Sequence, residues 1–190
     1  MKSLILLAAS ICVCCGGGGG PASGSATFSG LVSGQTLTPH DATAAVLSFS
    51  GTGVPGRAAL IAIASAPGLC SSLTGGKEPK STSYLVLTAF QMQRDYSAAP
   101  PPAPGTYYVA SAALENGVAV FASTNATCGL VAAPKPATTG TITFTSVGNR
   151  YSGSYDLTFA FGEHVTGTFD APLCGGISAL DPGSGTLTCQ

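Results

Sequence analysis

From residue 26 to its end, the chain alternates apolar and polar side chains over short stretches that are separated by Gly, Pro, Asn and Ser. This period of two predicts β-strands with one buried and one solvated face. So many short strands predict a single all-β domain, folded as an antiparallel β-sandwich or barrel. The nine predicted strands are residues 27–32, 44–49, 58–64, 83–93, 106–114, 118–124, 139–147, 150–161 and 165–171.

The last three predicted strands can be set in register, because their apolar residues must share the buried face. A two-residue Gly-Asn turn places Phe144 opposite Gly153. A three-residue loop at 162–164 then pairs Phe161 with Val165. We therefore expect a C-terminal antiparallel meander of three strands. The buried face of its middle strand is expected to hold Tyr151, Gly153, Tyr155, Leu157, Phe159 and Phe161.

Three other segments carry turn or loop signals. The Asn-Gly pair at 116–117 favours the type I′ turn of a tight hairpin, which would pair Glu115 with Val118. Four prolines within 98–105 cannot donate to a strand ladder, which predicts a crossing over the surface. The segment Asn125-Ala126-Thr127 matches a glycosylation sequon, and we interpret it as an ordinary turn.

The chain is poor in charge, which excludes one class of partner. Charged residues make up 8% of the sequence and the net charge is -1. Proteins that bind nucleic acids hold phosphates with clustered Lys and Arg, so we expect no nucleic-acid partner. The one long apolar run, residues 4–13, is shorter than the roughly 20 residues of a membrane-spanning helix.

The first twenty residues are typical of an export signal followed by a flexible tether. Residues 1–3 carry a positive charge, residues 4–11 are apolar, and five glycines occupy 16–20. With cysteines at positions 12, 14 and 15, the segment resembles the lipobox of bacterial lipoproteins. In that family, a cysteine that follows the apolar segment becomes the acylated first residue of the mature protein. The resemblance therefore implies a membrane anchor.

The resemblance implies that Cys15 is acylated, because the small residue Cys14 precedes it, and Cys14 itself is the alternative. It also implies a signal peptide at 1–14 and an acylated cysteine that begins the Gly-rich tether at 15–25. The predicted all-β domain then occupies 26–190. A glycine follows Cys15, where Asp commonly retains lipoproteins at the inner membrane, so the implied destination is the outer membrane. The alternative is a cleaved signal peptide and a free secreted protein.

Four cysteines remain in the domain: Cys70, Cys128, Cys174 and Cys189. An exported domain folds in an oxidising compartment, so we expect two disulfides. We predict that Cys174 pairs with Cys189, because they close a loop of about fifteen residues, worth roughly 3 kcal/mol. Cys70 then pairs with Cys128. None of the four belongs to a C-x-x-C pair, so we expect no metal site.

The predicted meander also suggests candidate chemistry. Its register places Asp156 opposite Asp170 on the solvated face, where two carboxylates could hold calcium or act as an acid/base pair. Calcium needs about six or more oxygens and no loop completes them. We therefore favour two hydrated acids and expect no cofactor. His164 belongs to the expected three-residue loop, and the chain lacks a nucleophile elbow, an H-E-x-x-H motif and a phosphate loop.

Four tyrosines are candidates for a glycan-binding or partner-binding surface: Tyr84, Tyr96, Tyr107 and Tyr108. Alternation buries one of the adjacent pair and exposes the other. The lack of a catalytic motif in an exported, anchored chain favours a non-catalytic envelope module that binds a protein or a glycan. The alternative is an envelope hydrolase or isomerase with Asp156, Asp170 or His164 as acid/base groups.

Overall fold

Eleven of the described strands form one mixed sheet that closes almost completely into a barrel. A computed structural model describes residues 23–51, 54–91, 102–110, 115–175 and 188–190. β2 (Ser29–Gly30) and β9 (Lys135–Pro136) pair with β12 and β8 respectively, beside the main path of the sheet. That path runs β1 (Ser25–Ala26), β12 (His164–Pro172), β11 (Arg150–Thr158), β10 (Thr139–Ser146), β7 (Gly105–Val109), β8 (Glu115–Ser123), β6 (Ser83–Gln91), β4 (Val54–Ala64) and β3 (Asp41–Gly51).

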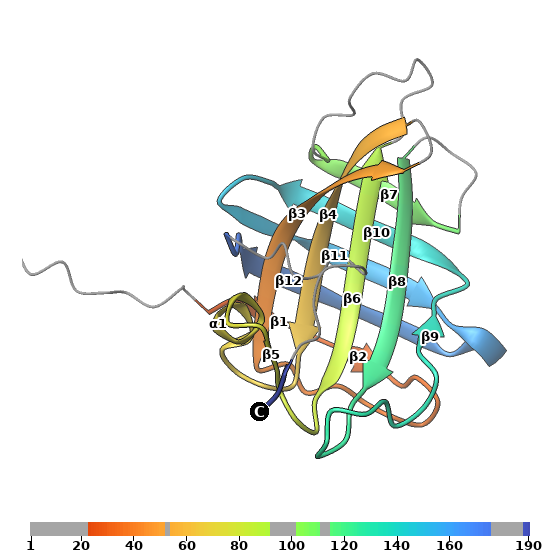
Figure 1. The fold of residues 1–190 in the computed structure, drawn as a ribbon. Coiled ribbons are helices and arrows are strands. Elements are labelled where there is room, and N and C mark those ends of the chain that lie inside the picture. The colour runs from red at the N-terminus through yellow and green to blue at the C-terminus, as the bar shows by residue number, and fades with distance from the viewer. Residues whose placement is uncertain (1–22, 52–53, 92–101, 111–114, 176–187) are drawn as a thin grey trace, which may run out of the picture.

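The two edges of the sheet meet along a seam between β3 and β12. Ala44 and Leu173 form a parallel bridge across this seam. β1 packs into the same seam, because Ser25 pairs with Asp170 of β12 and the preceding residue bonds to Asp41 of β3. Figure 1 shows β3, β4, β6 and β8 as one layer, which β10, β11 and β12 cross at a steep angle.

The main core fills the space between these layers. Alternate residues along 85–89 of β6 are buried and their neighbours are partly exposed, as period-two alternation requires. Phe144 makes edge-to-face contacts with three other core rings, those of Tyr107, Tyr151 and Phe169. The burial of this apolar surface is the main source of stability.

A smaller apolar cluster lies outside the barrel, where the helix α1 (Leu69–Thr74) covers β3 and β4. Leu69 and Leu73 of the helix pack there with small and aliphatic residues of both strands. After the helix, β5 (Lys77–Glu78) pairs in parallel with β13 (Thr188–Cys189). The C-terminal strand therefore lies next to the segment that follows the helix.

The all-β class is confirmed, but the predicted Asn-Gly hairpin is wrong. Glu115 and Val118 both lie within β8, which runs straight through the Asn-Gly pair and is antiparallel to β6. β7 pairs with β8 in parallel, with Tyr108 opposite Asn116, so the sheet is mixed. A continuous set of inter-strand partners overrides the local turn preference of two residues. Residues 111–114 of the predicted strand lie outside the described residues.

The C-terminal meander is confirmed, with one loop longer than predicted. The register of β10 with β11 is as expected up to a bulge near the turn. Between β11 and β12 the connection spans 159–163, so Val165 pairs with Leu157 and not with Phe161. The loop is odd in length, as buried parity requires, but it has two more residues than predicted. Phe161 is correspondingly exposed, within the 3-10 turn η1 (Ala160–Gly162).

The four domain cysteines form two disulfides, but the predicted pairing is wrong. Cys70 is bonded to Cys174, and Cys128 is bonded to Cys189. The chain after β12 runs beside α1, which brings Cys174 to the helix, and β13 lies near the turn after β8. Disulfides indicate an oxidising, extracytoplasmic compartment. No helix in the described ranges is long and apolar enough to cross a membrane.

Candidate functional site

The outer face of β7, β10, β11 and β12 is lined with hydroxyl groups. Every second residue of β10 from 139 to 145 is threonine, and these side chains alternate with the buried residues of the same strand. A row of paired positions crosses the strands from Tyr108 through Thr141 and Asp156 to Thr166, and then to Ser29 of β2. Four inter-strand steps of about 4.8 Å give this hydroxyl row a length of about 19 Å.

A second row of hydroxyls runs parallel to the first, two residues further along the strands. Thr106 and Thr143 lie 3.1 Å apart between their hydroxyl oxygens, and Thr27 and Thr168 lie 3.0 Å apart. Ser154 is paired with Thr143 and completes this row. The face therefore combines ordered donors and acceptors with little apolar surface except at its Tyr108 end, where the tyrosine is 53% exposed.

Asp156 and His164 form the one close acid–imidazole pair on this face. His164 Nε2 lies 2.7 Å from Asp156 Oδ1, and the two side chains are 56% and 63% exposed. His164 is the first residue of β12 and not a member of a three-residue loop, and it lies opposite Thr158. The loop lies two residues earlier in the chain than predicted, and this places the imidazole diagonally across from Asp156. Sequence analysis had instead paired Asp156 with Asp170.

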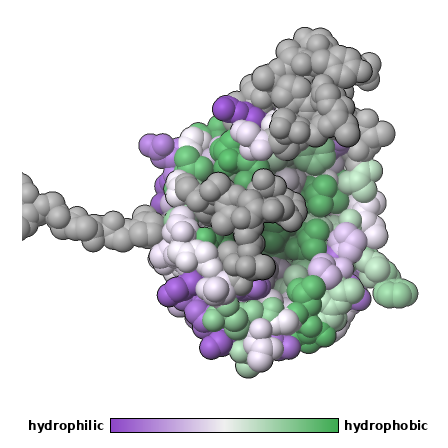
Figure 2. All heavy atoms as spheres, in the orientation of Figure 1, coloured by the Kyte–Doolittle hydropathy of each residue, from purple (hydrophilic) through white to green (hydrophobic). Residues whose placement is uncertain are grey.

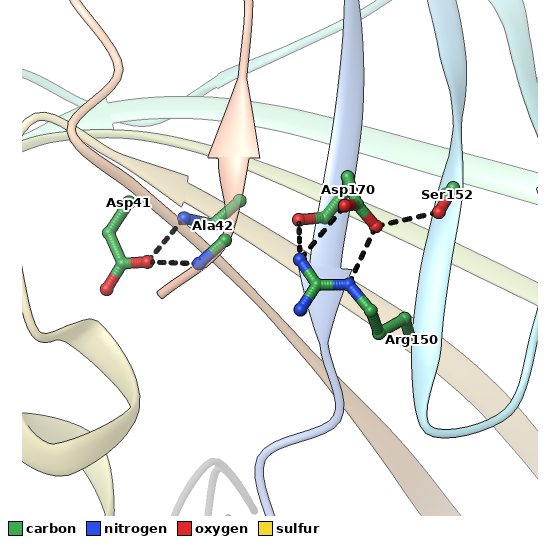
Figure 3. Close-up of polar contacts among 6 residues, drawn as sticks. Asp41, Ala42, Arg150, Ser152 and Asp170 are labelled. Carbon is green, nitrogen blue, oxygen red and sulfur yellow. Dashed lines mark hydrogen bonds and ion pairs between the residues drawn. The ribbon is translucent and has the colours of Figure 1, made fainter. Parts of the chain in front are cut away.

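The predicted Asp156–Asp170 pair does not form. Asp156 lies opposite Thr166, and Asp170 lies opposite Ser152, because the loop is centred on residue 161 and not on residue 163, which moves the register by two positions on each strand. Arg150 donates from Nε and Nη2 to the two oxygens of Asp170 at 3.0 and 2.9 Å. Ser152 donates to the same carboxylate at 2.8 Å (Figure 3).

The arginine fork changes the titration of Asp170. The hydrogen bonds from Arg150 lower the pKa of Asp170 below the usual value for aspartate, and the hydrogen bond from Ser152 lowers it further by a smaller amount. The Asp170 carboxylate therefore forms a hydrogen-bonded ion pair with Arg150, and both side chains are partly exposed. No cluster of three or more His, Cys, Asp and Glu that could hold a metal occurs among the described ranges.

Asp41, at the start of β3, organises the opposite side of the seam. The residue is 3% exposed, and its carboxylate accepts N–H donors from three segments of the chain. Oδ1 accepts from Ala42 at 2.8 Å (Figure 3) and from Gly24 at 3.0 Å. Oδ2 accepts from Leu69 at 2.8 Å. The residue therefore fastens the N-terminal strand, β3 and the start of α1 to one another, which sequence analysis did not detect.

The four candidate tyrosines separate into different environments. Tyr107 is buried and Tyr108 is exposed, which confirms the alternation between them. Tyr84 is partly buried, and its pKa is raised to about 12. Burial is the larger cause, and the negative charge of Glu78 is the smaller one. Tyr96 lies outside the described residues. Of the three that the structure describes, Tyr108 is the one whose ring lies exposed at the end of the hydroxyl row.

The other outer face of the barrel is apolar. Val118 is 43% exposed, and Val86 and Val120 beside it on β6 and β8 are partly exposed. Figure 2 shows apolar residues gathered over these strands. The two layers therefore present surfaces of opposite character, one apolar and one rich in hydroxyl groups.

The predicted turn at Asn125 is also confirmed. Asn125 Oδ1 accepts hydrogen bonds from the backbone N–H groups of Thr127 and Gly129.

Comparison of the chain with protein-family models, curated proteins and solved structures gives no match. The predicted acylation site, Cys15, and its alternative, Cys14, lie outside the described residues.

Proposed function

We propose that the protein is a lipid-anchored envelope module that binds a neutral glycan through the outer face of β7, β10, β11 and β12. The single observation that carries the proposal is the hydroxyl row that ends on exposed Tyr108. A tyrosine ring can stack on the apolar face of a sugar, and threonine and aspartate oxygens can bond to its hydroxyl groups. The proposed anchor is Cys15, and the proposed location is the outer membrane.

Two features support binding in preference to catalysis. The Asp156–His164 pair is more than half exposed on an open strand face, where water screens charge and exchanges protons freely. A catalytic acid or base works best in a site that excludes water around the reacting bond. A flat, ordered array of hydroxyl groups instead suits an extended polymer that lies across several strands.

Lipid anchoring is tested by labelling cells with a radioactive fatty acid and separating their membranes. The wild-type protein is expected to carry label and to sediment with outer membranes. Cys15→Ser is expected to lose the label and most of its membrane association, because its hydroxyl cannot accept the lipid that the lipobox cysteine receives. Label that persists in Cys15→Ser but disappears in Cys14→Ser would move the anchor to Cys14. An unlabelled wild type would refute anchoring.

Glycan binding is tested by cosedimentation with several insoluble neutral polysaccharides. Tyr108→Ala is expected to weaken retention on at least one of them by about tenfold, because the only exposed ring of the row is lost. Val118→Ala is the matched control, since it truncates an exposed apolar side chain on the other layer. Equal retention of both variants, or no retention of the wild type, would refute the proposal.

The same preparations decide between binding and hydrolysis. Soluble sugar released by the wild type and not by Asp156→Asn would identify Asp156 as a catalytic group and support the hydrolase. A bound but unchanged polysaccharide is the expected result. Asp156→Asn is then expected to weaken retention only, because an amide keeps one acceptor oxygen in the row.

A further inference from the structure

Three connections at one end of the barrel expose a concentration of apolar side chains. They are the segment 31–35 after β2, the segment 130–135 before and within β9, and the loop 159–163 between β11 and β12. Of seven large apolar side chains that are exposed in the described ranges, four belong to these segments. They are Leu31, Leu130, Val131 and Phe161, with exposures of 52%, 56%, 55% and 103%.

Hydrogen bonds connect these segments into one surface, the loop end. The Ser33 N–H donates to both oxygens of Glu163 at 2.8 and 2.9 Å, which joins the first segment to the third. Gln35 accepts from Ser123, and the Val131 N–H donates to the Ser123 carbonyl. The first two segments also line a shallow pocket of about 20 Å³, which is room for about one water molecule.

Phe161 is the most exposed member of the loop end and is held in an unusual conformation. Its φ is 63°, a left-handed value that is a true outlier for a bulky residue. The loop is closed by a hydrogen bond from the Phe159 N–H to the Glu163 carbonyl at 2.8 Å. Small residues, Ala160 and Gly162, flank the ring on both sides. A strained backbone that projects an aromatic ring into water suggests a contact outside the barrel.

We propose that the loop end docks on the surface of a lipid bilayer, with Phe161 and Leu31 inserted at the boundary between headgroups and acyl chains. The residues on both sides of Phe161, Ala160 and Gly162, are uncharged, and both oxygens of the Glu163 carboxylate already accept the Ser33 N–H. Lys135 lies beside the pocket, where its stem can cover apolar surface while its amine contacts a lipid phosphate. The choice of a bilayer as the occupant rests on the proposed anchor.

The tether is long enough for this contact. Ser25, where the described N-terminal strand begins, pairs with Asp170, whereas the loop end lies at the other end of β12. The 9 residues of β12 span about 30 Å. A fully extended tether from position 15 to position 23 spans about 30 Å as well. An anchored domain can therefore lie along the bilayer with the loop end in contact.

The test uses the absence of tryptophan from the full chain. Phe161→Trp and Leu173→Trp each introduce a single fluorophore in the otherwise unchanged protein, at opposite ends of β12. Leu173 is the matched control, because it is an apolar residue that is 40% exposed beyond the far end of the strand. Each variant is mixed with, or reconstituted into, phosphatidylethanolamine and phosphatidylglycerol vesicles with and without brominated acyl chains.

With vesicles, the emission of Phe161→Trp is expected to shift to shorter wavelengths and to be quenched several-fold more by brominated lipid than that of Leu173→Trp. Phe161→Ser, without a fluorophore, is expected to cosediment with vesicles about tenfold less than the wild type when the anchor is removed by Cys15→Ser in both. Equal quenching of the two tryptophan variants, or no shift for Phe161→Trp, would overturn the inference. Fatty-acid labelling separately tests the anchor, so failure of one proposal is distinguishable from failure of the other.

Discussion

Replacing Asp41 with asparagine isolates the contribution of one buried carboxylate to the seam. Asp41→Asn keeps an acceptor oxygen for Gly24 and Ala42, but its amide N–H₂ then faces the N–H of Leu69. One donor at the start of α1 is left without an acceptor inside the protein. The other two bonds lose the charge that strengthens them.

The expected loss of stability follows from these bonds. An unsatisfied buried N–H costs roughly 1–3 kcal/mol, and two weakened bonds cost roughly 1 kcal/mol more. The buried charge no longer has to be desolvated, which offsets about 1 kcal/mol of this loss. We expect a net destabilisation of about 2 kcal/mol, equivalent to a fall in Tm of roughly 4–8 °C for a domain of this size.

Urea unfolding followed by circular dichroism, with both disulfides intact, measures this loss. Asp170→Asn is the matched control, because its carboxylate lies in a partly exposed ion pair, where the same substitution should cost much less. Amide exchange at Leu69 should rise in Asp41→Asn and not in Asp170→Asn. Equal destabilisation by the two substitutions, or unchanged exchange at Leu69, would refute the role assigned to Asp41.

Three further results are expected. Mild reductant should open Cys128–Cys189 before Cys70–Cys174, because Cys189 is exposed whereas Cys174 is 4% exposed, and alkylation with peptide mapping identifies the first pair of free thiols. The raised pKa of Tyr84 favours the neutral phenol in the folded state, so its stabilisation is present below about pH 10 and is lost as pH rises through about 12. Tyrosinate absorbance measures that pKa, and Glu78→Gln should lower it. Phe161→Gly should leave stability unchanged or raise it by up to about 1 kcal/mol, because glycine adopts the left-handed φ without strain; a loss in thermal unfolding above that size would instead assign Phe161 a packing role.

The sequence by itself determined the all-β class, the C-terminal meander and the register of β10 with β11. These features depend on neighbouring strands, whose alternation of apolar and polar residues admits one register with a buried face. The exposure of Tyr108 beside buried Tyr107 follows from the same rule. The need for two disulfides also follows from the sequence, because an even number of cysteines remains in the predicted exported domain.

Only the tertiary structure decided which distant segments meet. Alternation repeats every two residues, so it fixes the parity of the 159–163 loop but not its position along the chain, and the predicted facing of Asp156 and Asp170 failed for that reason. The partner of Cys70 depends on the closure of the barrel, which brings the end of β12 to α1. Two of the donors to Asp41, Gly24 and Leu69, come from segments distant in the sequence. No local pattern identifies them, because they donate through backbone N–H groups, which every residue except proline carries.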